Sequence, residues 1–181
     1  MIRMMSCRSE LHPSEIEDEL KTLTLVCDTR EHDTTALRRR LEGTGLPVIR
    51  EKLDFADYSC KTEHFDFTNC FAIERKMSID EVAQNLTRGR KRFAHEFERA
   101  KAVNARVYLL IENGSWEAIF GHKYRTLVHP NALIASLFTW QARYNAAVLF
   151  CRPETTPMII REVLMREVRH ELEQIASKVG D

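Results

Sequence analysis

Apolar runs that end in charged residues constrain the fold of this chain most. Arg106–Glu112 has a continuous apolar core, which predicts a buried strand. Leu23–Cys27 is a similar β-rich run that leads directly into Asp28, so it predicts a buried strand that delivers charged groups at its carboxyl end. Because such strands are buried, we expect helices to cover the sheet that they form.

The remaining pattern alternates between strand and helix periods. Further strands are predicted at 47–53, 57–61, 66–76 and 146–150, and helices at about 34–41, 131–143 and 156–176. Residues 78–100 have helical spacing and form one long helix or two short ones, with Gly89 as the break. Short polar turns between 47 and 76 favour an antiparallel meander. Strand–helix alternation on both sides of this meander predicts an α/β fold with a mixed central sheet flanked by helices on both faces.

The length of 181 residues favours one compact domain. Residues 1–21 lack a sustained apolar period, which indicates a flexible arm with one short helix around 15–20. We expect the domain itself at 22–176 and a short tail at 177–181.

Charge distribution says more than net charge here. The 27 basic and 27 acidic residues cancel, so the chain is not a polycation that coats nucleic acid indiscriminately. Six basic residues against two acidic ones nevertheless lie between Arg88 and Lys101, whereas Glu10–Glu19 is acidic.

Cysteine usage and hydropathy indicate an intracellular protein with no membrane association. The five cysteines are odd in number and form no C-x-x-C pair, which fits neither a disulfide framework nor a zinc knuckle. No stretch approaches the roughly 20 apolar residues of a membrane span, and the first residues do not resemble a secretory signal.

The tripeptide Glu74-Arg75-Lys76 carries the strongest chemical signal. Alternation in a strand places Glu74 and Lys76 on one face, about 6.6 Å apart along the chain, and turns Arg75 the other way. A carboxylate and an ammonium at that separation can flank a hydrated divalent metal on a phosphate, and Mg²⁺ prefers such oxygen ligands. Lys76 can orient the attacking water, help to deprotonate it or stabilise developing charge, and we favour orientation.

A second carboxylate is expected because one glutamate is a weak magnesium site. Asp57 and Asp28 are the candidates, since each lies at the end of a predicted strand. Converging carboxylates repel one another, and a metal ion compensates for that repulsion. Glu-Arg-Lys alone also fits a solvated strand end, but the extended pattern that adds Asp80 four residues later is rare by chance.

The motif series resembles the XPF-type structure-specific nuclease domain in order and spacing. It comprises Val26-Cys27-Asp28-Thr29-Arg30-Glu31, Ala56-Asp57-Tyr58, Glu74-Arg75-Lys76-x-x-x-Asp80 and Gly89-Arg90. This resemblance implies a restriction-endonuclease-like fold, a Mg²⁺ or Mn²⁺ site, cutting of branched or flapped DNA in repair or recombination, and a homodimer formed partly through the C-terminal helices. By the same resemblance the metal-site acids are Asp28, Asp57 and Glu74, the catalytic lysine is Lys76, and the supporting charged residues are Arg30, Glu31 and Asp80.

Two departures from the family pattern concern single residues. The family usually has glycine before the second aspartate, where this chain has Ala56, and alanine disfavours a left-handed backbone. At Gln84 the family more often has serine. Many relatives also carry a tandem helix–hairpin–helix module; we expect none after the last predicted helix of this sequence, and we therefore expect DNA to be held otherwise. The candidates for phosphate contact are Arg88, Arg90, Lys91, Arg92 and His95.

Two rival interpretations stay open at this point. A non-catalytic subunit would dock DNA or a partner nuclease without cutting, and a restriction-type nuclease would use the same core on other DNA. The candidates for phosphate contact named above, here called the basic cluster, also fit a solvated helix face. No Gly-rich phosphate loop occurs, and the isolated histidines His64, His122 and His129 lack metal-ligand spacing. Trp116, Phe120, Phe138 and Trp140 fit core or dimer packing better than base stacking.

Overall fold

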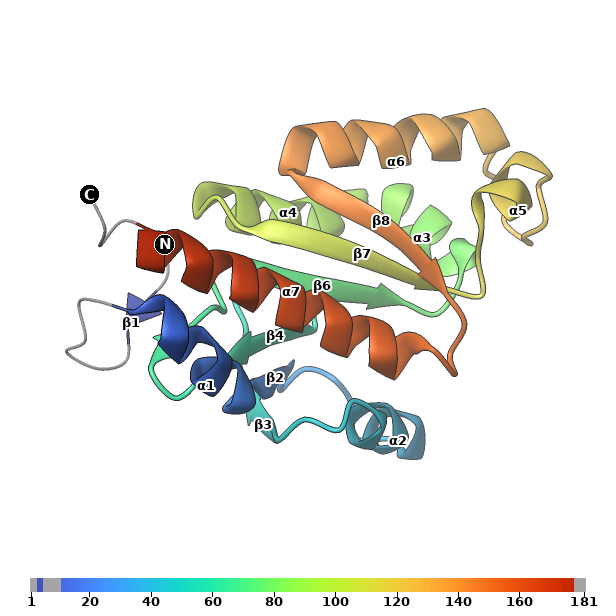
Figure 1. Cartoon of the computed structure of the whole chain (residues 1–181). Coiled ribbons are helices and arrows are strands. Elements are labelled where there is room, and N and C mark those ends of the chain that lie inside the picture. Colours follow the sequence, from blue (N-terminus) through green and yellow to red (C-terminus); the bar gives the residue numbers. More distant parts are fainter. Residues whose placement is uncertain (1–2, 5–10, 178–181) are drawn as a thin grey trace.

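The computed structural model describes residues 3–4 and 11–177 as a mixed sheet between two layers of helices (Figure 1). The central strand order is β3-β2-β4-β6-β7-β8, and β5 and β1 extend it beside β4. The strands are β1 (Arg3–Met4), β2 (Thr24–Asp28), β3 (Val48–Glu51), β4 (Tyr58–Lys61), β5 (Phe65–Asp66), β6 (Phe71–Lys76), β7 (Arg106–Glu112) and β8 (Ala146–Cys151). This arrangement confirms the predicted mixed sheet with helices on both faces.

Two hydrophobic cores lie on opposite faces of the sheet. One packs under α1 (Ile16–Lys21), α2 (Thr35–Gly43) and α7 (Thr156–Ser177). The other packs under α3 (Ile79–Leu86), α4 (Arg90–Ala102), α5 (Trp116–Phe120) and α6 (Pro130–Tyr144). Figure 1 shows α7 crossing the sheet on one side and α4 and α6 on the other. We call these sides the α7 face and the α4 face.

The predicted meander is wrong in one connection. Strand β3 does not pair with β4; it pairs in parallel with β2, at Leu25↔Val48 through Asp28↔Glu51. The reason is helix α2, which connects β2 to β3, because a strand–helix–strand unit returns its second strand parallel to the first. β2 therefore lies between β3 and β4, which it pairs antiparallel.

Two predicted elements are divided in the structure. The strand expected at 66–76 is split into β5 and β6, because Asp66 Oδ1 accepts hydrogen bonds from Thr68 N and Oγ1 and forms a turn there. The helical segment from 78 to 102 is two helices, α3 and α4, and Gly89 stands at the start of the second. Gly89 is thus the break that the sequence allowed.

The N-terminal arm is not loose over residues 11–21. Leu11, Ile16 and Leu20 are buried in the α7-face core, and a short 3-10 helix, Pro13–Glu15, leads into α1. This stretch is too short for its apolar residues to show a clear helical period in the sequence. Its three apolar side chains nevertheless pack it against α7. Residues 1–2 and 5–10 of the predicted arm and 178–181 of the predicted tail lie outside the described residues, and the domain boundaries at 22 and 176 stay predictions.

The α4-face core is rich in aromatic rings. Trp140 stacks on Phe93 at a centroid separation of 4.7 Å and meets Phe97 edge-on at the same separation. This packing confirms a core role for Trp140 and fixes α4 against α6. Within the described part of the chain, no helix is long and apolar enough to cross a membrane.

Candidate active site

The end of β6 carries the predicted pair on one face of the sheet. Glu74 and Lys76 point to the α4 face, where Glu74 Oε1 accepts a hydrogen bond from Lys76 Nζ at 2.5 Å. Their neighbour Arg75 points to the α7 face. The Lys76 ammonium also lies 5.2 Å from the centroid of the Phe93 ring on α4, an arrangement that favours a cation. The alternation predicted from the sequence is confirmed.

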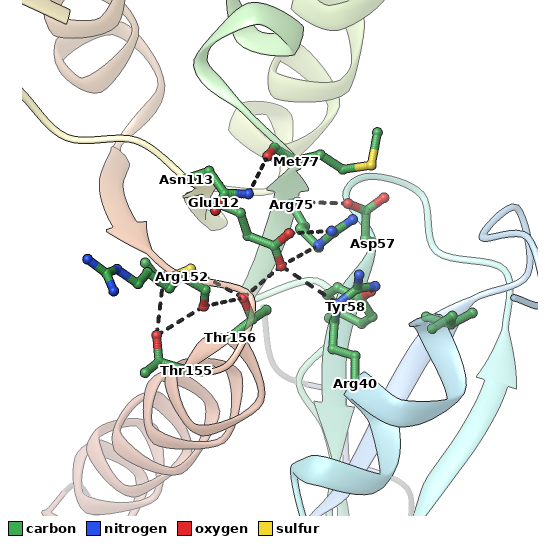
Figure 2. A network of polar contacts seen from close by, with 12 residues as sticks. Arg40, Asp57, Tyr58, Arg75, Met77, Glu112, Asn113, Arg152, Thr155 and Thr156 are labelled. Atoms are coloured by element: carbon green, nitrogen blue, oxygen red, sulfur yellow. Dashed lines mark hydrogen bonds and ion pairs between the residues drawn. The ribbon is translucent and has the colours of Figure 1, made fainter. Parts of the chain in front are cut away.

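Asp57 joins this pair through the backbone of the neighbouring strands. Its N–H donates to Ile73 O at 3.0 Å, and its Oδ2 accepts from the Arg75 N–H at 2.8 Å (Figure 2). Within the described residues, Asp57 Oδ1 makes no hydrogen bond and remains open to a ligand.

The Asp28 carboxylate, unlike that of Asp57, has both oxygens hydrogen-bonded within the protein. It is buried, and its carboxylate accepts from Arg30 N at 2.6 Å, from the Arg30 guanidinium at 2.8 Å and 3.1 Å, and from Leu53 N at 2.6 Å. Burial alone would raise the pKa of Asp28, but these donors outweigh it and hold the pKa below its usual range. Asp28 thus fixes Arg30 rather than facing the open site.

A cleft of roughly 180 Å³, here called the site cleft, collects the chemical groups. Its lining residues are Arg30, Asp57, Glu74, Lys76, Asn85, Arg92, Phe93 and Glu96. Four predicted site residues therefore meet there, together with one member of the predicted basic cluster. Asp28, Glu31 and Asp80 do not line it.

Glu31 and Asp80 act from outside the site cleft. The negative charge of Glu31 is one of the influences that raise the pKa of Asp57. Asp80 Oδ1 accepts hydrogen bonds from the backbone N–H groups of Arg125 and Thr126, at 2.8 Å and 2.7 Å. Asp80 therefore fixes the loop after α5 to the first turn of α3 and has no direct access to the site.

Sequence reasoning missed three residues of the cleft: Asn85, Phe93 and Glu96. Glu96 lies one helical turn after Arg92, and its Oε1 is 3.6 Å from Arg30 Nη1. The i, i+4 spacing of Arg92 and Glu96 on a predicted helix was the available signal. Glu96 brings a third carboxylate to the cleft from the helix that covers it.

Burial has the largest influence on the pKa values of Asp57 and Glu74. It raises the pKa of Asp57 well above its usual range, and the negative charges of Glu74 and Glu31 raise it further. Burial also raises the pKa of Glu74 to about 7, against the lowering influence of Lys76. Burial would lower the pKa of Lys76, but Glu74 and Asp57 outweigh it, so this pKa is raised and the ammonium keeps its proton.

The donor set fits a hard divalent cation held by few protein ligands. Buried Glu74 and half-buried Asp57 both have raised pKa values and face one lysine, and a cation between them would relieve their repulsion. Within the described ranges, no group of three or more His, Cys, Asp or Glu side chains is arranged to hold a metal. Mg²⁺ is usually bound by one or two carboxylates plus water and substrate phosphates, so Asp57 and Glu74 suffice.

The basic cluster borders the site cleft on one side. An adjoining cleft of roughly 460 Å³, here called the basic cleft, is lined by Lys76, Glu81, Gln84, Asn85, Arg88, Gly89 and Arg92. Arg90, Lys91 and His95 are exposed on α4 and do not line it. Among the described residues, no ion pair or side-chain hydrogen bond neutralises Arg88 or Arg92. Such unpaired cations suit phosphate groups.

A compensated network supports the site from the α7 face (Figure 2). Glu112 pairs with the Arg75 guanidinium through both carboxylate oxygens and accepts from Thr156 Oγ1 at 2.7 Å. Arg40 Nη1 donates to the Tyr58 hydroxyl at 2.9 Å beside it. Burial would raise the pKa of Glu112, but the donors from Arg75 and Thr156 lower it. This network holds Arg75, whose backbone N–H orients Asp57.

Ala56 adopts a backbone conformation that favours glycine. Its φ is +60°, in the left-handed region, and the residue is buried. A left-handed backbone costs a non-glycine residue about 1–2 kcal/mol. Alanine thus adopts, at the position before Asp57, the left-handed backbone that it disfavours.

Comparisons with known proteins agree with this architecture. The model of the ERCC4 domain family matches residues 27–159. Two solved structures are similar: XPF from Aeropyrum pernix, with 22% identity, and XPF from Aeropyrum pernix in complex with DNA, with 24% identity, each at a TM-score of 0.58.

These matches cover 78% and 79% of this chain but 59% and 63% of those chains, so this chain spans less than two thirds of their length. At such identities the likeness shows the fold, which is restriction-endonuclease-like as predicted. No curated protein matches.

Replacing Ala56 tests the strained turn. Ala56→Gly should change the free energy of unfolding by less than about 1 kcal/mol, because relief of the left-handed strain offsets loss of a buried methyl group. Ala72→Gly is the matched control: Ala72 is buried in β6 with ordinary φ, so its replacement should destabilise by about 1–2 kcal/mol. Urea unfolding measures both, and equal losses would contradict the strain.

Replacing Asp57 tests the electrostatics without metal. A carboxyl group with a raised folded pKa contributes stability at low pH and loses it as pH rises through that pKa. In EDTA, Asp57→Asn should therefore stabilise the protein at pH 8 by on the order of 1–3 kcal/mol and have a smaller effect at pH 5. Asp33→Asn, which removes an exposed ion pair with Arg38, is the control with no such gain. Urea unfolding at the two pH values decides, and a variant destabilised more at pH 8 than at pH 5 would refute the assignment.

Proposed function

The chain belongs to the ERCC4 domain family, with the nuclease-type domain of XPF, and we propose that it is a metal-dependent endonuclease that hydrolyses phosphodiester bonds in branched or flapped DNA. The observation that carries the proposal is the site cleft, where Asp57, Glu74 and Lys76 converge beside unpaired arginines. The DNA complex of one similar structure is consistent with DNA as the substrate.

Asp57 and Glu74 would hold a Mg²⁺ or Mn²⁺ ion in the proposed mechanism. When bound, the ion would neutralise charge on the scissile phosphate and acidify an attacking water. Asp57 has Oδ1 open for this purpose, while Arg75 N–H keeps Oδ2 in place. Asp28, which the family resemblance makes a metal ligand, is proposed instead to position Arg30, because its oxygens are already taken by four donors.

Lys76 would act as a fixed cation. Its raised pKa keeps the ammonium charged, which argues against a role as general base at neutral pH. Glu74 and the ring of Phe93 hold the ammonium in the cleft, where it can donate to the attacking water or to the phosphate. In the reaction the water oxygen bonds to phosphorus, the ester P–O bond breaks and the water's proton leaves to solvent or the departing oxygen.

Arg30 and Arg92 would bind the phosphate from opposite walls. Arg30 is held by Asp28 and lies near Glu96, whereas Arg92 lines both the site cleft and the basic cleft. We propose Arg88 and Arg92 as the members of the predicted basic cluster that contact DNA closest to the site. Arg90 and Lys91 would contact it farther out on α4.

A homodimer through the C-terminal helices stays a prediction from the family. Two surface features are compatible with it. Phe138 on α6 is 54% exposed and stacks on Trp116, and Met158 on α7 is 65% exposed. Intracellular action likewise stays a prediction.

Cleavage assays on flap, fork and linear duplex DNA with Mg²⁺ or Mn²⁺ test the function. The wild type should cut the branched substrates, and Asp57→Asn, Glu74→Gln and Lys76→Met should each reduce cleavage at least about 10²-fold. Arg166→Ala, an exposed position on α7, is the control that should cut normally.

The rival interpretations give other results. Failure of a folded, metal-binding wild type on every substrate would favour a non-catalytic subunit. Equal cutting of linear and branched DNA would favour a restriction-type nuclease.

A further inference from the structure

The loop after α5, residues 121–129, is an ordered part of the surface next to α3. Asp80 on α3 holds the backbone N–H groups of Arg125 and Thr126. The Tyr124 hydroxyl donates to Val128 O at 2.7 Å across the loop. The loop therefore has a defined shape against α3.

A third depression lies between this loop and α3. It measures roughly 490 Å³, is here called the loop groove, and is lined by Gln84, Thr87, Arg88, Arg125, Thr126, Leu127 and Val128. It shares Gln84 and Arg88 with the basic cleft, which in turn shares Lys76, Asn85 and Arg92 with the site cleft. The three depressions therefore lie next to one another beside α3, and their sequence is here called the track.

Charge along the track changes from balanced to basic. Three basic and three acidic residues line the site cleft, and three basic and one acidic residue line the basic cleft. The loop groove has two arginines and no acidic residue. The lining residues thus sum to zero charge in the site cleft and to +2 in each of the other two depressions, so a polyanion that extends from the site cleft meets a positive surface.

The two arginines of the loop groove are free to bind a ligand. No ion pair of Arg88 is found among the described residues. Arg125 Nε lies 3.8 Å from Asp80 Oδ2 with its side chain 95% exposed, and such exposed pairs are weak. The neighbouring Leu127 is 97% exposed, so a ligand that covers the groove would also bury apolar surface.

We propose that the loop groove binds the phosphate backbone of a duplex arm of the DNA, with Arg88 and Arg125 as its phosphate contacts. The proposal rests on the proposed function, because the same DNA occupies the site cleft. Asp80 is accordingly a positioning residue of the loop.

DNA binding in EDTA tests the proposal without requiring cleavage. Fluorescence anisotropy of a labelled flap DNA gives Kd at several salt concentrations for the wild type, Arg125→Ala, Arg125→Glu and Arg92→Ala. Arg125→Ala should raise Kd about 3–10-fold and reduce the slope of log K against log salt by about 0.9, the value for one phosphate contact. Arg125→Glu should weaken binding further.

Arg166→Ala is the matched control, since it removes an exposed arginine on the α7 face. Thermal unfolding of each variant checks that Arg125, which is almost fully exposed, is not needed for folding. Unchanged binding by both Arg125 variants, with weaker binding by Arg92→Ala, would overturn the loop groove and leave the proposed function standing. Absence of DNA binding by the wild type would overturn both.

Discussion

The convergence of two carboxylates in one cleft, Glu74 buried and Asp57 half-buried, is the constraint on which this structure depends. Asp57 and Glu74 lie near a single lysine, and their raised pKa values show that the positive charge around them is too small to stabilise both carboxylates in the ionised form. A sheet strand rarely keeps such a pair without a partner, because an uncompensated buried charge is strongly unfavourable. The arrangement is therefore understandable as a site for a cation and a phosphate, and the surrounding contacts keep the two acids in place.

On the opposite face of the same strands, neighbouring donors compensate the charge of a buried carboxylate. Glu112 is as buried as Glu74, yet Arg75 and Thr156 satisfy it and its pKa is lowered. The Asp28 carboxylate is likewise satisfied, by donors from Arg30 and Leu53, and its pKa is also lowered. The left-handed backbone of Ala56 directly precedes Asp57, and because strain of this kind clusters at functional sites, it is consistent with the role proposed for Asp57.

The sequence predicted the parts of the site that depend on strand alternation. Glu74 and Lys76 share a face because the period of a strand is two, and no tertiary detail alters that. The surroundings of Asp28 could not be predicted in this way, because two separate loops, which carry Arg30 and Leu53, supply the donors to its carboxylate. Glu96 could not be identified as a site residue from the sequence, because only the folded structure brings α4 over the site cleft. The pairing of β3 with β2 likewise follows from the path of α2 and not from the strand's own residues.

A crystal structure with bound Mn²⁺ tests the central claim most directly. The account predicts an ion coordinated by Asp57 Oδ1 and a Glu74 carboxylate oxygen at about 2.1 Å, with Asp28 still bonded to Arg30. An ion bound by Asp28, with Arg30 displaced from that carboxylate, would contradict it.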